Sequence, residues 1–358
     1  MKVIEARNVN DAYLKGLRLL KDQGLAQGSR AGEVLVMPCP VTTVYEWPLE
    51  RVLFNSIRDA NPFFHLGEAL WMLAGRNDAT WLDRFVKDFS SRFAEKDGQQ
   101  HGAYGYRWLH HFDLEGGGYR SLPNQLDTVV RLLRANPDDR RVVLTMWDPV
   151  ADLGIDRRDI PCNTHAYFRI LNGALDITVC CRSNDAVWGA YGANAVHFSI
   201  LQEYIATRIG VDVGLYFQIS NNFHVYTDVL KKVWPEVWPS GDNTVWDKHR
   251  YERGRVEVQP LMDDPGSFDS ELDIFLQRLG EDLAWRYENK FFSDVATPFF
   301  LAHNSWRNRE YNQAQVWLEE MPENNDWRLA ASEWMKRRLE RMPTIHVGDL
   351  EGGDRGVE

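Results

Sequence analysis

Two alternating runs joined by a tight turn constrain the fold of this chain more than any other feature. The runs are THAYFRI, residues 164–170, and ALDITVCCRS, residues 174–183, and Leu171-Asn172-Gly173 joins them. Asn-Gly between alternating apolar and polar residues is the strongest short-range signal for a β-hairpin. The sequence therefore predicts an antiparallel strand pair near the middle of the chain.

The remaining periodic segments predict a mixture of helices and strands. Strands are expected over residues 33–38, 41–47, 142–149, 213–226 and 255–261, and helices over 10–24, 61–78, 123–141, 193–210, 227–234, 267–285 and 326–342. Residues 101–108, a Gly-aromatic segment, are expected to form a loop. This mixture predicts an α+β fold with a mixed or antiparallel sheet flanked by helices.

Composition and charge narrow the kinds of partner that the chain can have. It has 358 residues, of which 44% are apolar and 26% charged, and its formal net charge is −11. A negative chain repels nucleic acid and anionic membranes, and no apolar run of about 18 residues predicts a membrane span. We therefore expect no nucleic acid and no membrane as partners, and an anionic small substrate only where arginines gather locally.

The cysteines and the N-terminal segment indicate a compartment. The four cysteines, Cys39, Cys162, Cys180 and Cys181, form no CxxC pair, so neither a disulfide framework nor a metal site is predicted. The segment MKVIEARNVNDAYLKG lacks the apolar stretch of a signal peptide. A reducing, cytoplasmic setting is expected.

The character of the sequence changes beyond about Trp238. Up to that point strands and helices alternate, and after it most of the predicted elements are helices. We expect a catalytic or binding core over residues 1–238 and a divergent, mostly helical part over 239–345 that packs on the core. The polar, Gly-rich segment 346–358 is expected to be disordered.

Cys162 can be a packed thiol or a nucleophile. A free cysteine is most often a small buried hydrophobe, and we assign that role to Cys180 and Cys181. Cys162 differs, because it lies between a proline-bearing loop and a strand. Several basic residues are near it along the chain or on the paired strand: Arg140, Arg141, Arg157, Arg158 and Arg182. Guanidinium groups favour the thiolate, which is the reactive form, so we predict a reactive Cys162.

Arginines and a carboxylate offer further chemistry. Arg140-Arg141 and Arg182-Ser183 present guanidinium groups and a hydroxyl that suit phosphate oxygens, although an Arg-Arg pair is more often a solvated basic face. Glu68 lies at helical spacing among apolar residues, where a carboxylate holds and relays a proton more readily than in water. A solvent-facing position on an amphipathic helix is the alternative for Glu68.

Three more polar residues are candidates for ligand contacts. Asn194 begins a predicted helix and is either a ligand-reading amide or only a helix cap. His224 and Tyr226 alternate with Val225 and so point to one face of a strand. They suit sugar hydroxyls, or they satisfy one another inside the core.

Together and in this order, these segments resemble the thymidylate synthase superfamily, which includes pyrimidine-nucleotide hydroxymethylases. The likeness runs from about Arg51 to Trp234, is looser over residues 29–32, and cannot be followed beyond about Trp238. It rests on a glutamate helix, a Tyr-Gly-x-x-Trp segment, paired arginines before a strand, a nucleophile loop, an Arg-Ser-x-Asp…Asn signature and a His-x-Tyr motif: GEALWMLAGRND, GAYGYRW, DDRRVVLTMWDP, IPCNTHAYF, CRSNDAVWGAYGANAVHF and NNFHVY. It implies a thymidylate-synthase-like α+β fold with a helical C-terminal extension.

The resemblance also implies a role for each matched residue. Cys162 would add to C6 of a pyrimidine deoxynucleotide monophosphate, whose C5 would then attack the methylene of 5,10-methylenetetrahydrofolate. Glu68 and Tyr104 would order water and move protons near C5. The remaining contacts would be Arg30, Arg140, Arg141, Arg182 and Ser183 to the phosphate, Asn194 to the base, His224 and Tyr226 to the ribose, and Asp185 and Trp71 to the folate. A homodimer is implied, with Arg140 and Arg141 reaching into the partner's site.

The chain departs from the family at three places. Asn163 follows the nucleophile where the family usually has a histidine that helps order water at O4 of the base. The segment before Asn194 is one residue longer than usual. A long segment follows Tyr226 in place of the short apolar tail that closes over the folate in the family.

These departures lead to a predicted substrate and product. A neutral amide at residue 194 matches the N3–H donor and O4 acceptor of uracil together, unless the amide is flipped and reads cytosine. A polar Asn163 and the missing tail favour water over hydride as the final acceptor, because hydride transfer needs a sealed site. We therefore predict conversion of dUMP to 5-hydroxymethyl-dUMP, an activity that supplies a modified base for viral DNA in the host cytoplasm.

Four alternatives stay open at this point. Two are enzymes: thymidylate synthase, which shares the chemistry up to the last step, and dCMP hydroxymethylase, which acts on another base. One is a non-catalytic nucleotide-binding protein, against which the presence of Cys162 argues. The last is an interaction module formed by the tryptophan-rich C-terminal part, which can instead act as a lid over the site.

Overall fold

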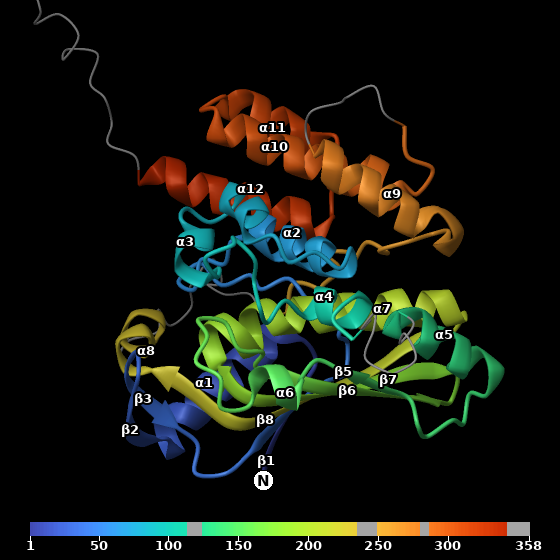
Figure 1. The fold of residues 1–358 in the computed structure, drawn as a ribbon. Helices are drawn as coiled ribbons and strands as arrows, with labels where there is room; N and C mark the ends of the chain where they lie inside the picture. The colour runs from blue at the N-terminus through green and yellow to red at the C-terminus, as the bar shows by residue number, and fades with distance from the viewer. Residues whose placement is uncertain (113–123, 235–248, 280–285, 342–358) are drawn as a thin grey trace, which may run out of the picture.

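The computed structural model describes residues 1–112, 124–234, 249–279 and 286–341 (Figure 1). The tail predicted over 346–358 and the end of the helix predicted over 267–285 lie outside the described residues. None of the helices in the described part of the chain combines the length and the apolar character that a bilayer span requires.

One mixed sheet forms the base of the molecule. Within the described residues it has eight strands, in the order β1-β4-β8-β7-β6-β5, with the β2–β3 hairpin joined to β8 through β3. β1 pairs with β4 in parallel and β7 with β8 in parallel, and the other pairs are antiparallel. The strands are β1 (Lys2–Ala6), β2 (Leu25–Ser29), β3 (Gly32–Val36), β4 (Val41–Tyr45), β5 (Val143–Thr145), β6 (Asn163–Leu171), β7 (Ala174–Asp185) and β8 (Asp212–Tyr226). The predicted α+β class with a mixed sheet is confirmed.

The predicted hairpin is present and sets the register of the nucleophile loop. Leu171 lies opposite Ala174, and Asn172 and Gly173 have φ angles of 53° and 80°. Two positive φ angles define a type I′ turn, whose twist matches that of the flanking strands. At the other end of the hairpin, the Arg182 N–H donates a 2.8 Å hydrogen bond to the Cys162 carbonyl. The loop that carries Cys162 is therefore tied to the end of β7.

The helices form layers above the sheet (Figure 1). Figure 1 shows α7 lying along the sheet, α2 above α7, and α9–α12 on the far side of α2. The helices are α1 (Val9–Gln23), α2 (Pro62–Leu73), α3 (Phe89–Phe93), α4 (Tyr104–Leu109), α5 (Gln125–Ala135), α6 (Pro149–Asp152), α7 (Asn194–Ile209), α8 (Thr227–Val233), α9 (Pro265–Arg278), α10 (Thr297–Arg307), α11 (Tyr311–Glu319) and α12 (Asp326–Glu340), with the 3₁₀ helix η1 (Ala79–Arg84) and the π-helices η2 (Ala186–Ala193) and η3 (Phe291–Ala296). Helix α7 connects the parallel strands β7 and β8, as a crossover between parallel strands requires.

Two local predictions are wrong. Part of the loop expected over 101–108 is the helix α4, which packs so closely on α2 that a Cβ on Gly105 would collide with the Met72 carbonyl. The strand expected over 255–261 is reduced to one bridge between Glu257 and Asn325. Asn325, the residue that pairs with Glu257, is followed directly by α12. The bridge therefore does not extend into a strand pair among the described residues.

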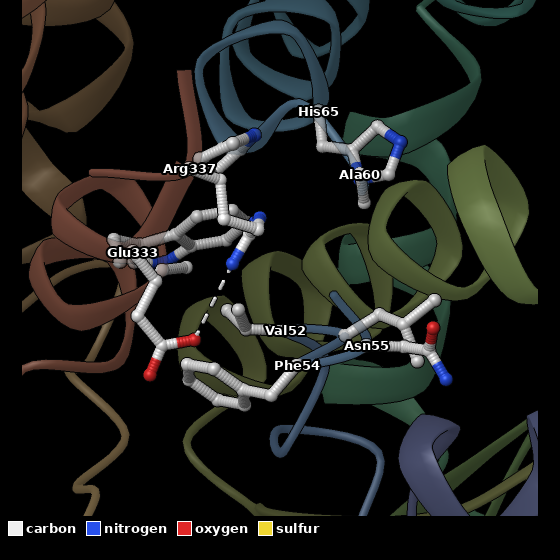
Figure 2. Close-up of a pocket in the computed structure, with 11 residues that line it drawn as sticks. Val52, Phe54, Asn55, Ala60, His65, Glu333 and Arg337 are labelled. Carbon is white, nitrogen blue, oxygen red and sulfur yellow. Dashed lines mark ion pairs between the residues drawn. The ribbon is translucent and has the colours of Figure 1, made fainter. Parts of the chain in front are cut away.

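Aromatic side chains attach the C-terminal helices to α2. The ring of Phe63 on α2 lies 4.5 Å from that of Phe299 and 5.6 Å from that of Trp334, measured between centroids. Figure 2 shows a second contact, where Glu333 and Arg337 of α12 face Asn55 and His65 across a small cavity.

That cavity measures about 10 Å³, which is room for about one water molecule. It marks where the C-terminal helices meet the core, and it is too small to bind a nucleotide.

Candidate active site

A larger pocket lies above the carboxyl end of β7. It has a volume of about 310 Å³ and is lined by residues of α2, α4, the loop before β6, the end of β7 and the start of α7. The predicted site residues that line it are Glu68, Trp71, Tyr104, Cys162, Ser183, Asp185 and Asn194. Among the described residues the lining ends at His197, so the described C-terminal helices contribute no side chain to this pocket, and α2 lies between them and it.

Tyr104 holds the nucleophile loop in place. Its hydroxyl oxygen accepts the backbone N–H groups of Cys162 and Asn163, at 3.3 and 3.2 Å. Burial raises the pKa of Tyr104 well above its ordinary value, so the side chain stays protonated. The hydroxyl proton is not used in these two bonds and remains available to a ligand.

The expectation that arginines hold Cys162 as a thiolate is wrong for the ligand-free protein. Burial raises the pKa of the Cys162 thiol, and the carboxylate of Asp159 raises it further. The charge of Arg182 lowers it, but not enough to offset burial. The prediction counted five arginines by their place in the sequence. Apart from Arg182, none of them lowers the pKa of the thiol to a comparable extent.

Arg182 braces the nucleophile loop from outside. Its Nε donates to the Pro161 carbonyl at 2.8 Å, and its Nη2 donates to the Ile160 carbonyl at 3.0 Å. The side chain is exposed, whereas the neighbouring Ser183 lines the pocket. The guanidinium therefore reaches the loop from solvent, next in sequence to a residue that lines the pocket.

The other predicted phosphate and sugar contacts lie outside the pocket lining. Arg30 is exposed in the β2–β3 turn, and β3 pairs with β8 so that Val36 is opposite His224. Arg30 thus lies in the turn that leads into β3, and the neighbouring strand β8 carries the rings of His224 and Tyr226, whose centroids are 5.8 Å apart.

Arg140 and Arg141 occupy an exposed turn before β5, and the guanidinium of Arg141 pairs with Asp139 at 2.8 Å. The structure does not bring these two arginines to the pocket of their own chain.

A chain of side-chain amides fixes the orientation of Asn194. The Asn163 Nδ2 donates to Asn194 Oδ1 at 3.0 Å, and Asn194 Nδ2 donates to Asn184 Oδ1 at 3.1 Å. Asn184 Nδ2 donates to Gln218 Oε1 at 3.3 Å, and Gln218 Nε2 donates to the Ala190 carbonyl at 3.3 Å.

A backbone carbonyl can only accept, so it anchors the direction of every amide in this chain. Asn194 retains one unused N–H and one unused lone pair, as reading a base requires.

An unusual helix start creates this arrangement. Residues 186–193 form the π-helix η2, which runs without a break into α7. Asn194 begins α7, as predicted, but the N-cap position belongs to Ala193, so Asn194 is not the helix cap. One extra residue in a helical segment is accommodated by a π turn, and π turns recur at functional sites. A Cβ on Gly189 would lie 2.7 Å from Asn184 Oδ1, so glycine leaves the space that the amide chain occupies.

The residues around Asp185 suit a flat ring with N–H donors. One carboxylate oxygen accepts the N–H groups of Val187 and Trp188 at 2.8 and 2.6 Å. The other oxygen is buried and has no hydrogen-bond partner among the described residues. The Trp188 ring is 53% exposed at the pocket, and the Arg58 guanidinium stacks on it at 4.2 Å. The pterin of a folate offers such a ring and such donors, so these residues fit it.

Sequence reasoning missed several pocket residues, among them Trp188, described above, and Asp159 and His197. Asp159 Oδ2 accepts the Gly102 N–H at 2.9 Å, and burial raises the pKa of its carboxyl group. His197 lines the pocket three residues after Asn194, on the same face of α7. The spacing of three was the available signal, but a histidine on an apolar helix resembles a core residue. Within the described residues, no group of three or more His, Cys, Asp or Glu side chains is placed to hold a metal ion.

Comparisons with known proteins identify the family to which the chain belongs. The sequence model of the family described as thymidylate synthase matches residues 12–238. The chain therefore belongs to the thymidylate synthase family, whose members transfer one-carbon units.

Several relatives carry more specific names. The protein named deoxyuridylate hydroxymethyltransferase of Pseudomonas phage M6 is 44% identical over 346 residues, covering 94% of this chain and 95% of that protein. The protein of the same name from Bacillus phage SP01 is 38% identical over 192 residues, 53% of this chain and 50% of that one. A putative thymidylate synthase of Methanosarcina acetivorans is 26% identical over 230 residues, 63% of this chain and 89% of that one.

Proposed function

We propose that the protein converts dUMP to 5-hydroxymethyl-dUMP with a one-carbon unit from 5,10-methylenetetrahydrofolate. The observation that carries the proposal is one pocket lined by Cys162, by the oriented amide of Asn194 and by the carboxylate of Glu68. The names of the two phage relatives support the same reaction. Such an activity would supply a modified base for viral DNA in the host cytoplasm.

Cys162 would act as the nucleophile of this reaction. Its thiolate adds to C6 of the pyrimidine, and the electron pair of the C5–C6 double bond moves to the O4 enolate. Burial raises the pKa of the thiol in the free protein, so a nearby base must take the proton when the substrate is bound. The bound folate supplies the one-carbon unit to C5, and Asp185, Trp71 and Trp188 are the residues that would hold it.

Asn194 would read the base. Its unused lone pair accepts N3–H of uracil while its unused N–H donates to O4. Cytosine presents the opposite pattern and would leave both groups unpaired in a buried site. The anchored amide chain supports this choice, because reversing Asn194 alone would break its bonds to Asn163 and Asn184.

The nucleotide's phosphate and ribose would extend from the pocket toward exposed groups. Ser183 and Arg182 would meet the phosphate at the pocket entrance, and Arg30 would approach from the neighbouring hairpin. His224 and Tyr226 would contact the ribose. Charge-assisted hydrogen bonds from guanidinium groups to phosphate provide the affinity.

A second copy of the chain would complete the site. The outer face of the sheet carries a row of partly exposed side chains at paired positions: Val143, Tyr167, Thr178, Phe217 and Val44. Exposed apolar side chains in a continuous row are typical of an interface. Arg140 and Arg141 precede Val143 at the edge of this row, so a homodimer built on this face would carry them to the partner's phosphate site.

An assay of the product decides between this activity and the alternatives. The protein is incubated with dUMP or dCMP and 5,10-methylenetetrahydrofolate, and the nucleotide is analysed by mass spectrometry. A gain of about 30 Da with tetrahydrofolate release indicates hydroxymethylation, whereas a gain of about 14 Da with dihydrofolate release indicates thymidylate synthesis, since only hydride transfer oxidises the folate. Turnover of dCMP but not dUMP would contradict the assignment of the base.

A further inference from the structure

A buried histidine faces the predicted proton-moving carboxylate of the pocket. His197 Nε2 on α7 lies 3.0 Å from Glu68 Oε2 on α2. His197 is 4% exposed, and the Glu68 side chain is 13% exposed. The packing of α2 on α7 therefore brings an imidazole and a carboxylate together at the pocket wall.

The two groups have no other use that the structure shows. Their approach is close enough for an ion pair, but its angles do not make a hydrogen bond. Among the described residues, both ring nitrogens of His197 and the Oε2 atom of Glu68 lack a hydrogen-bond partner. Buried polar atoms without partners are costly, and in a pocket they indicate atoms reserved for a ligand or for ordered water.

Asn163 cannot supply a base next to the nucleophile. Its Nδ2 is used as a donor to Asn194, and an amide does not take up a proton at ordinary pH. A reaction that ends with water needs a group to accept the proton of that water. Glu68 is a carboxylate in the pocket that can accept this proton, and His197 Nε2 contacts its Oε2.

We propose that His197 is a positioning residue that fixes Glu68 to deliver the water of the hydroxymethylation step; the inference rests on the function proposed above. After the folate has left, the pyrimidine carries an exocyclic methylene on C5 and the Cys162 sulfur on C6. Water oxygen bonds to the methylene carbon, and the water proton passes to Oε1 of Glu68. In this step the His197 imidazole, whose Nε2 lies 3.0 Å from Oε2 in the ligand-free protein, turns so that its Nε2–H donates a hydrogen bond to Oε2. The methylene π electrons form the C5–C4 enolate.

The last part of the step restores the enzyme. The enolate electrons re-form the C5–C6 double bond, the C6–sulfur bond breaks, and Cys162 leaves as the thiolate. The sum is dUMP plus methylenetetrahydrofolate plus water giving 5-hydroxymethyl-dUMP plus tetrahydrofolate, so no oxidant or reductant is required.

The test separates the water step from the steps before it. Adduct formation with 5-fluoro-dUMP and methylenetetrahydrofolate stops before C5 loses its substituent, and mass spectrometry of the protein measures it. Turnover of dUMP in the presence of 2-mercaptoethanol measures the fate of the methylene, because the thiol competes with water for it. The variants are His197→Leu, His197→Gln and, as a control for the loss of a buried imidazole outside the pocket, His303→Gln.

We expect His197→Leu to form the fluoro adduct at the wild-type rate. Its ratio of hydroxymethyl to thiol-trapped product should fall about 10- to 100-fold, the effect of one hydrogen bond to a charged group. His197→Gln keeps a donor and should recover most of the ratio, and His303→Gln should match the wild type.

A His197→Leu enzyme with the wild-type product ratio would overturn the inference, as would a parallel loss of the fluoro adduct, which indicates a structural role only. Thymidylate from the wild-type enzyme would instead overturn the proposed function itself.

Discussion

Asn163 donates a 3.0 Å hydrogen bond from its Nδ2 to the Oδ1 of Asn194, so the amide that would read the base is oriented before any ligand binds. The direction of this bond follows from the Ala190 carbonyl, which accepts from Gln218 at the far end of the amide chain. On the proposed function, the residue that stands where the family usually has a histidine would thereby act on base selection.

Replacing Asn194 with aspartate should shift the preference toward cytosine. Asn194→Asp removes the N–H that meets O4 and provides oxygens that accept from the amino group of cytosine. Each buried polar group left unpaired costs about 1–3 kcal/mol, so the ratio of kcat/KM for dCMP to that for dUMP should rise by about 10²-fold or more. Steady-state kinetics with both nucleotides measure this ratio, and an unchanged ratio would reject Asn194 as the base reader.

The space at Gly189 should be needed for the same selectivity. Gly189→Ala places a Cβ 2.7 Å from Asn184 Oδ1 and should displace Asn184 from its bond to Asn194. With its orientation no longer fixed, Asn194 should discriminate less, and we expect dUMP selectivity over dCMP to fall about tenfold. Gly28→Ala is the matched control, because no heavy atom lies within 4 Å of a Cβ there. Equal selectivity in the two variants would show that the amide chain is not required.

Cys162 is predicted to be indispensable. Cys162→Ala should bind dUMP with an affinity close to that of the wild type, since Asn194 and the phosphate contacts remain. Turnover should fall below detection, because no other described thiol lines the pocket. Calorimetry measures the binding and product analysis the turnover. Measurable product from Cys162→Ala would exclude covalent catalysis through this sulfur.

The sequence predicted the main elements of the fold and the residues in spaced motifs, but not the side-chain contacts that orient the residues of the candidate site. The hairpin at Asn172-Gly173 was predictable because the turn residues themselves determine the φ angles. Cys162 and Asn194 were predictable because each is part of a spaced motif. His197 and Gln218 were not, because their roles depend on which helix or strand packs beside them. The π-helix before Asn194 was not predicted either. The sequence indicated it only indirectly, through a segment one residue longer than is usual in the family.

The C-terminal helices should stabilise α2, which carries Glu68. Phe299→Ala removes a ring 4.5 Å from that of Phe63 in a fully buried cluster and should lower the free energy of unfolding by ~3–5 kcal/mol. Denaturant titration followed by tryptophan fluorescence measures the loss. Val316→Ala, on the exposed side of α11, should change stability by less than about 0.5 kcal/mol. Equal stabilities of the two variants would show that α10 does not support the core through Phe63.

Asp326 should make stability depend on pH. It is 1% exposed at the start of α12, and its Oδ2 accepts the Tyr251 hydroxyl at 3.0 Å. Burial raises the pKa of its carboxyl group to about 7, and the charge of Arg51 opposes the shift. Because this pKa exceeds the unfolded value of about 4, the folded state binds the proton more tightly. The contribution to stability is complete below about pH 4 and is lost as the pH rises through about 7.

Asp326→Asn removes this titration and should show which part of the pH dependence belongs to Asp326. Between about pH 4.5 and 7.5, the free energy of unfolding of the wild type should fall by roughly a few kcal/mol relative to that of the variant. Other carboxylates, such as Asp59 with its arginine partners, have lowered pKa values and act in the opposite direction. The difference between the two proteins, measured by urea denaturation at each pH, cancels those contributions. A difference that does not change over this range would mean that Asp326 is ionised in the folded protein, with Arg51 compensating its burial.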